Sequence, residues 1–152
     1  MIPYKISFAG AGKVAGALCG ELYNNGYLIQ QIVSRHEKNG RKLADLYKAE
    51  WSSELIFQDS ADVIIVAVPD DSIKDVIYKI QCRKETIVVH TAGSLGLDVF
   101  PSHYENFGIL YPLQTFSEVR KINFKTIHLF SDHLAIKVMK CLGVCTVWLL
   151  LC

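Results

Sequence analysis

The sequence lacks an excess of charge of either sign. Its 152 residues include 16 lysines and arginines and 15 aspartates and glutamates, which gives a formal net charge of +1. A balanced charge provides no general attraction to nucleic acid or to anionic membrane surfaces. We therefore expect neither a nucleic acid nor a membrane among the partners of this chain.

A disulfide framework and a zinc-finger pattern are also missing. The five cysteines are an odd number, and only Cys141 and Cys145 lie close together in the sequence. No further His/Cys pair follows at zinc-finger spacing, so we expect no metal site. The amino-terminal residues MIPYKISFAGAG do not show the basic and then apolar regions of a signal peptide. Reduced thiols in a cytoplasmic protein are the simplest interpretation.

What the chain does contain is apolar sequence arranged in alternating strands and helices. With 51% hydrophobic and 20% charged residues, it is typical of a globular protein. We expect strands at residues 4–9, 27–33, 62–68, 86–90 and 108–111, a short strand within 51–57, and helices at 13–25, 37–48 and 71–80. The aliphatic run at residues 62–68 is typical of a strand buried on both faces. This order predicts an α/β fold with a doubly wound parallel sheet in three layers, α/β/α.

A glycine-rich turn stands between the first expected strand and the first helix. The residues GAGKVA, from Gly10 to Ala15, fit the pattern G-x-G-x-x-A of Rossmann dinucleotide-binding folds. Gly10 permits the tight turn, Gly12 leaves room for a pyrophosphate, and Ala15 lets the helix pack on the sheet. The amides at the start of the helix then face the phosphates. The alternative is a strand-turn-helix that needs glycine only for its turn.

The end of the second strand favours NADP over NAD. An NAD site usually has an acidic residue there to bind the ribose 2′-hydroxyl, but this strand is followed by Ser34 and Arg35. A hydroxyl and a guanidinium suit a 2′-phosphate, and further positive charge follows from Lys38, Arg41 and Lys42. Two alternatives stay open. In the first, Arg35 is only a solvated charge at the start of the next helix. In the second, Glu37 is the acidic residue that binds the ribose of NAD.

Four segments of the sequence together resemble a known family. They are VSRH after the second strand, VIIVAVPDDSI around the fourth, HTAGSLGLDVF after the fifth and GILYPLQTFS after the sixth. They resemble Rossmann-like oxidoreductases with a C-terminal helical domain, which are related to pyrroline-5-carboxylate reductase and to deazaflavin-dependent NADP reductases. The resemblance covers about residues 4–117. It implies a nicotinamide cofactor and a small-molecule substrate that is not established. It also implies a helical domain that completes the active site and usually forms a homodimer.

The resemblance also assigns roles to individual residues. Gly10, Gly12, Lys13 and Val14 line the pyrophosphate, and Ser34 and Arg35 take the adenosine phosphate. Val68, Pro69 and Asp70 pass beneath the nicotinamide ribose. Topology supports the last assignment, because ligands lie outside the carboxyl ends of parallel strands. Pro69 is equally well explained as a strand terminator.

Polar residues after the fifth strand are candidates for the substrate side. His90, Thr91 and Ser94 share the same rim, and they can bind substrate or the nicotinamide amide. His90 is a candidate acid or base near neutral pH, although a histidine at a strand end is more often a hydrogen-bonded structural residue. Gln114 either binds a polar ligand or holds its own loop.

The sequence departs from the resemblance after the Rossmann domain, which we place at residues 1–117. We interpret residues 118–152 as a remnant or truncated C-terminal extension, with a strand at 127–130 and a helix at 134–142. The apolar residues 144–151 are either a last buried strand or part of an aberrant tail. Two functions follow. One is an NADP-dependent oxidoreductase, inactive if the substrate domain is lacking, and the other is a non-catalytic, redox-sensing or regulatory dinucleotide-binding module.

Overall fold

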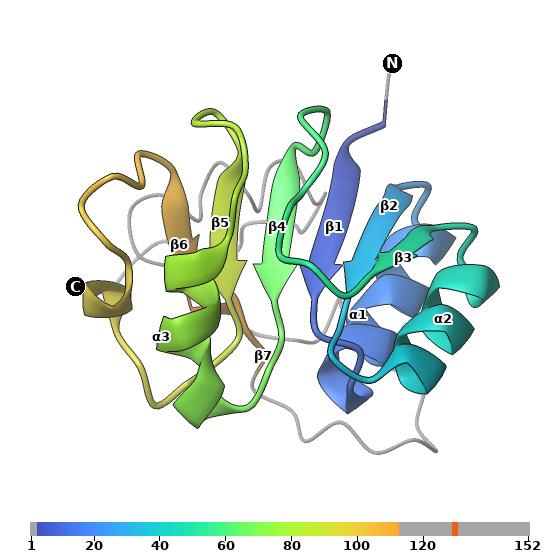
Figure 1. Cartoon of the computed structure of the whole chain (residues 1–152), viewed down its shortest axis with the longest axis horizontal. Coiled ribbons are helices and arrows are strands. Elements are labelled where there is room, and N and C mark those ends of the chain that lie inside the picture. The colour runs from blue at the N-terminus through green and yellow to red at the C-terminus, as the bar shows by residue number, and fades with distance from the viewer. Residues whose placement is uncertain (1–2, 113–128, 131–152) are drawn as a thin grey trace.

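The computed structural model describes residues 3–112 and 129–130 of the chain. Strands and helices alternate along most of its length, as Figure 1 shows. The elements are β1 (Lys5–Ala9), α1 (Lys13–Asn24), β2 (Leu28–Val33), α2 (Glu37–Leu46), β3 (Glu50–Ser52), β4 (Val63–Val66), α3 (Asp70–Lys79), β5 (Ile87–His90), a 3-10 turn η1 (Leu97–Val99), β6 (Phe107–Ile109), β7 (Tyr111–Pro112) and β8 (Leu129–Phe130). The strands and helices predicted up to residue 90 are therefore confirmed, with changes only at their ends.

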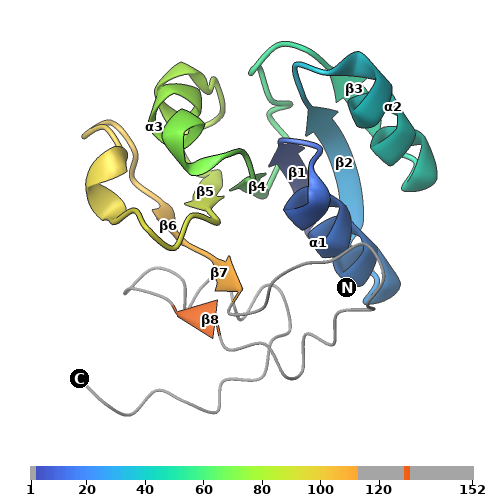
Figure 2. The same cartoon turned by 90° about the horizontal axis from the view of Figure 1, so that it is seen from below.

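The main sheet has six strands in the order β3-β2-β1-β4-β5-β6. Every neighbouring pair is parallel. This is the strand order of the Rossmann fold. Helices cover both faces, with α3 on one side of the sheet and α1 on the other in Figure 2. The prediction of a doubly wound, three-layer α/β/α fold is confirmed.

Two apolar cores, one on each face of the sheet, hold the layers together. Alternate residues of β1 and β4 point to opposite faces, so Ile6 and Ile65 join α1 in one core while Ile64 joins α3 in the other. All four residues of β4 are buried. The aliphatic run in the sequence is explained by this double coverage, because a central parallel strand needs apolar side chains on both sides.

The strand predicted at residues 108–111 is wrong in its extent. β6 starts at Phe107 and ends at Ile109, and the chain then leaves the main sheet. The backbone of β7 pairs antiparallel with β8 in a separate two-stranded sheet. The expected strand at 127–130 is thus found as β8, whereas the helix at 134–142 and the strand at 144–151 lie outside the described residues.

Two features are absent from residues 3–112 and 129–130. No helix there is long and apolar enough to cross a membrane. No group of three or more histidine, cysteine or acidic side chains there is arranged to hold a metal ion.

Candidate functional site

The candidate site lies at the carboxyl edge of the sheet, where β1 and β4 end side by side. The chain leaves β1 through α1 toward β2, and it returns from β3 to β4 on the other side of β1. Connections that depart in opposite directions leave a crevice outside the strand ends, and ligands of open α/β sheets bind there. The glycine turn after β1 and the Ala67–Asp70 segment after β4 both lie at this point.

Gly10 is required by the protein itself. Its φ of +118° lies in a region that side chains disfavour. A Cβ at this position would lie 2.1 Å from the carbonyl oxygen of Ala67. The glycine therefore allows the turn after β1 to pack directly against the end of β4.

Gly12 has no such internal reason to be glycine. Its φ of −84° and ψ of −166° are accessible to any residue. A Cβ there would meet nothing within 4 Å among the described residues, and the position is exposed. The described residues thus leave the space in front of Gly12 open, as the predicted pyrophosphate site requires.

The amino end of α1 offers hydrogen-bond donors that the described residues do not cap. The first intrahelical bond to Gly12 comes from Gly16, so the amides of residues 13–15 have no acceptor within the helix. No side chain caps this end, and the first turn has no acidic residue. By contrast, α3 has Asp70 and Asp71 in its first turn. The amino end of α1 is therefore open to an anionic ligand.

The end of β2 forms a small polar cluster with α2 and β3. The Ser34 hydroxyl accepts a 3.1 Å hydrogen bond from Trp51 Nε1 and donates one of 3.1 Å to the carbonyl of His36. Arg35 is exposed and makes no side-chain hydrogen bond or ion pair with the described residues. Arg41 lies over the indole ring of Trp51, 4.6 Å from its centroid.

Glu37, the alternative ribose acid, is engaged elsewhere. Its Oε1 lies 2.6 Å from Arg41 Nε in an ion pair one turn apart on α2. Both side chains are more than half exposed, so the pair is weak in free energy. The ion pair nevertheless directs the Glu37 carboxylate along the helix toward Arg41. Arg35 precedes Glu37 and is the first charged side chain after β2.

The segments after β4 and β5 are joined to each other. The Ser94 hydroxyl donates a short hydrogen bond to the Asp70 carboxylate. The amide of Thr91 donates a 3.2 Å bond to the carbonyl of Val66. Pro69 precedes the first residue of α3, and Val68 is half-buried beside Gly10. The structure therefore brings the residues predicted for the nicotinamide side onto one rim.

His90 lies beneath this rim with both ring nitrogens engaged. It is fully buried, its Nδ1 accepts a 3.2 Å hydrogen bond from the amide of Ala92, and its Nε2 lies 3.2 Å from the carbonyl of Gly96. This arrangement defines a neutral ring with the proton on Nε2. Burial lowers the pKa of His90 below 6.5, although the bond to Gly96 and the charges of Asp70 and Asp98 oppose the shift.

Three further residues are Gln114, Cys19 and Trp51. Gln114 lies outside the described residues. Cys19 is buried in the core under α1, and burial raises the pKa of its thiol, which makes it inert. The sequence interpretation missed Trp51. The available signal was Gly40, a glycine inside a helix, which indicates close approach of another group.

Comparisons with known proteins identify a family for this chain. Residues 5–93 match the family described as NADP oxidoreductase, coenzyme F420-dependent. No protein with a curated functional description matches the sequence.

Solved structures share the fold. A Bacteroides fragilis protein named as a proposed NADP oxidoreductase is 31% identical, with a TM-score of 0.80 over 93% of this chain and 57% of its own. Protein TM1727 from Thermotoga maritima is 24% identical, with a TM-score of 0.68 over 91% of this chain and 53% of its own. Prephenate dehydrogenase from A. aeolicus, solved with hydroxyphenyl propionate and NAD+, is 14% identical, with a TM-score of 0.71 over 93% of this chain and 57% of its own. The chain thus spans little more than half the length of these relatives.

Proposed function

The chain belongs to the family of coenzyme F420-dependent NADP oxidoreductases, and we propose that it binds NADP(H) at the carboxyl edge of its sheet as the cofactor domain of a hydride-transferring enzyme. Its fold is that of an NAD(P)-dependent oxidoreductase domain.

Gly12 is the observation that carries the proposal. Gly10 is explained by the left-handed turn and by the carbonyl of Ala67, but neither conformation nor packing against the described residues explains a glycine at position 12. An external ligand does explain it, because a side chain there would occupy the place of the pyrophosphate. The uncapped amides at the start of α1, together with Lys13 and Val14, then supply donors and a lining for the phosphates.

The preference for NADP(H) is supported by the residues at the end of β2. No carboxylate stands at the tip of the strand, and the nearest one, on Glu37, is paired with Arg41. Arg35 is exposed beside Ser34, where its planar guanidinium can meet a 2′-phosphate with two parallel hydrogen bonds. A ribose 2′-hydroxyl offers Arg35 no charge, so NADH binds less tightly.

The nicotinamide end is assigned to the rim formed by Val68, Pro69 and Asp70 after β4 and by Thr91 and Ser94 after β5. The bound nicotinamide supplies the hydride chemistry, and the protein orients it. The Ser94 hydroxyl donates its hydrogen bond to the Asp70 carboxylate, so the Ser94 oxygen can accept a hydrogen bond from an amide N–H. Ser94 thereby has a defined direction in which to hold the nicotinamide amide or a substrate.

The catalytic role of His90 stays a prediction. The hydrogen bonds of the His90 ring favour a structural role instead. Its two hydrogen bonds fix the segment from Ala92 to Gly96, which carries Ser94. The same observation favours the second candidate function, a non-catalytic dinucleotide-binding module, since the ring has no nitrogen free for a substrate. Substrate-dependent oxidation of NADPH, followed by absorbance over a panel of carbonyl and imine compounds, distinguishes an enzyme from a module.

Binding itself is tested by titrating the purified chain with NADPH and with NADH. The proposal requires saturable binding of both, tighter for NADPH. Equal affinity contradicts the NADP preference, and the absence of binding contradicts the proposed function.

A further inference from the structure

Trp51, in β3, contacts the polar groups at the end of β2 through its side chain. Its indole Nε1 donates to Ser34 Oγ over 3.1 Å, and its ring carries the Arg41 guanidinium at 4.6 Å from the centroid. A cation held over an indole face is attracted by the electrons of the ring. One side chain therefore contacts both a hydroxyl and a positive charge beside the proposed 2′-phosphate position.

Gly40 makes this close contact possible. A Cβ on Gly40 would lie 2.1 Å from Ser34 Oγ and 2.3 Å from Trp51 Nε1. With glycine in place, α2 packs directly over the hydrogen bond between these two side chains. The position of the bond is thus fixed by three elements, which are the end of β2, helix α2 and strand β3.

The direction of the Trp51 bond defines what Ser34 can do. An indole N–H only donates, so it occupies one acceptor site of the Ser34 hydroxyl. The hydroxyl hydrogen must then point elsewhere, and it is given to the carbonyl of His36 over 3.1 Å. This single hydrogen can turn from a neutral carbonyl to a phosphate oxygen, because a hydrogen bond to an ionised acceptor is about twice as strong.

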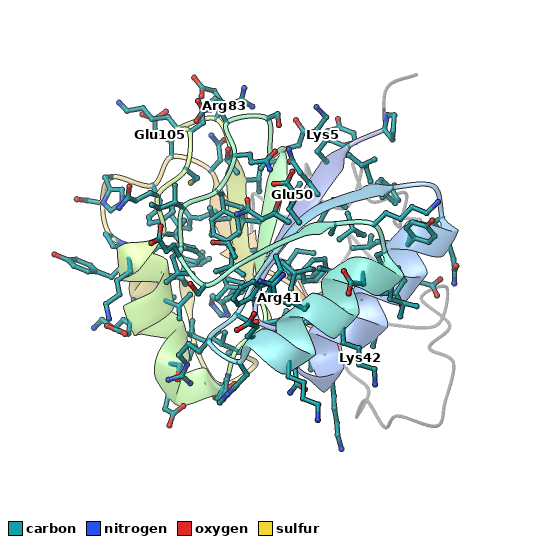
Figure 3. All side chains as sticks on the ribbon, turned by 45° about the vertical axis from the view of Figure 1, so that its right-hand side comes forward. Lys5, Arg41, Lys42, Glu50, Arg83 and Glu105 are labelled. Atoms are coloured by element: carbon teal, nitrogen blue, oxygen red, sulfur yellow. The ribbon has the colours of Figure 1, made fainter. Side chains whose placement is uncertain are left out.

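Arg41 is held in a comparable way. Glu37 accepts from its Nε over 2.6 Å, and Trp51 covers one face of its guanidinium. Its two terminal nitrogens have no hydrogen-bond partner among residues 3–112. In Figure 3, Arg41 extends from α2 toward the middle of the molecule, whereas Lys42 lies on the other side of the helix.

We propose that Trp51 is a positioning residue for the 2′-phosphate of NADP(H), which it serves by orienting the Ser34 hydroxyl as a donor and by holding the Arg41 guanidinium beside it. The inference rests on the proposed function, because it concerns the selectivity of the same site. It predicts that Trp51 affects the ratio of the NADPH and NADH affinities rather than dinucleotide binding in general.

The first test is Trp51→Phe, which keeps an aromatic ring under Arg41 but replaces the indole by a smaller phenyl ring that has no N–H to donate. We expect NADPH to bind about threefold to tenfold more weakly, as for the loss of one hydrogen bond, with the affinity for NADH unchanged. In a Ser34→Ala background the same replacement should have no further effect, since Trp51 acts through the hydroxyl. Equal losses for both cofactors, no loss for NADPH, or an undiminished loss in the Ser34→Ala background each overturn the inference.

A second measurement leaves Trp51 in place. The chain has two tryptophans, so Trp148→Phe leaves a single indole N–H signal in a nitrogen-15 NMR spectrum. We expect that signal to shift more with adenosine 2′,5′-bisphosphate than with adenosine 5′-monophosphate, since the probes differ only in the 2′-phosphate. Equal shifts overturn the role of Trp51 while leaving dinucleotide binding intact. A chain that binds neither NADPH nor NADH instead contradicts the proposed function, which separates the two failures.

Discussion

At the scale of single residues, the proposed selectivity for NADP(H) over NAD(H) depends on Ser34 and Arg35. Both follow β2 directly, at the place where NAD-binding domains usually have a carboxylate. The side chain of Arg35 is exposed and has no ion-pair partner among the described residues. Its charge is thus available to a ligand, and its contribution should decrease with ionic strength.

Replacing Arg35 with aspartate tests this residue directly. Arg35→Asp should weaken NADPH binding by about tenfold to a hundredfold, because a charge-assisted hydrogen bond is lost and a repulsive charge is added. The affinity for NADH should be equal or higher, since the new carboxylate can bind the ribose 2′-hydroxyl. Lys42→Asp is the matched control with an equal change in charge, because Lys42 lies on the other side of α2 from Arg41 (Figure 3). Equal effects of the two variants on NADPH would show that only the general potential matters.

His90 is a residue whose protonation opposes folding. Burial lowers its pKa below 6.5 in the folded chain, whereas the unfolded chain takes up the proton near that ordinary value. Between these two values the unfolded state binds more protons, so stability falls as the pH falls. The contribution of His90 is therefore complete above pH 6.5 and is lost progressively below it.

Melting temperatures measured from pH 8 to pH 5 provide the check on His90. The unmodified chain should lose stability below about pH 6.5, the ordinary pKa of histidine, and His90→Gln should flatten that decline at the expense of lower stability throughout. His103→Gln, at an exposed position, is the control that should keep the decline. An identical pH profile for His90→Gln and the unmodified chain would contradict the buried neutral ring.

At the scale of elements, α2 is placed by the absence of a side chain at Gly40. Gly40→Ala should destabilise the fold by about 1–3 kcal/mol, because the added methyl overlaps Ser34 and Trp51 and forces them apart. Gly16→Ala is the matched control, since its Cβ would meet only Leu43 Cδ1, at 3.8 Å. That variant should be neutral or gain roughly 0.5–1 kcal/mol from helix propensity. Urea denaturation of both compares the two, and equal effects would exclude close packing at Gly40.

Elements with a strong local pattern could be predicted from the sequence. The alternation of aliphatic strands with helices up to His90 predicted the layers, and the glycine turn predicted which strand end carries the site. The break after β6 could not be predicted, because it depends on pairing of Tyr111 and Pro112 with Leu129 and Phe130, far along the chain. A run such as GILY reads as one strand until its partners are known.

The candidate site was predictable only in part, for the same reason. Gly10, Gly12, Ser34 and Arg35 follow directly from a motif and its spacing. The bond between Ser94 and Asp70 joins segments that follow different strands, and the contact of Trp51 with Ser34 depends on how closely α2 packs. A sequence shows such residues as polar or aromatic, but the sheet order decides which of them meet.

At the scale of the whole molecule, the strand order β3-β2-β1-β4-β5-β6 collects the site. Because all six strands run parallel, the residues after β1, β2, β4 and β5 share one edge of the sheet. The cores on the two faces are apolar and covered by helices, whereas the candidate site residues lie at this edge. The family match over residues 5–93 covers β1 to β5, together with the turns after β1, β2 and β4.

The central claim is that the glycine turn binds the pyrophosphate, and calorimetric titration of NADPH into the unmodified chain and into Gly12→Val tests it most directly. The melting temperature of each chain is measured as well. A Cβ at position 12 would meet no described residue within 4 Å, so we expect Gly12→Val to leave the melting temperature unchanged and to remove detectable NADPH binding. The unmodified chain should bind one NADPH, and more tightly than NADH. A folded Gly12→Val chain that binds NADPH as tightly as the unmodified chain would contradict the assignment of the glycine turn as the phosphate site.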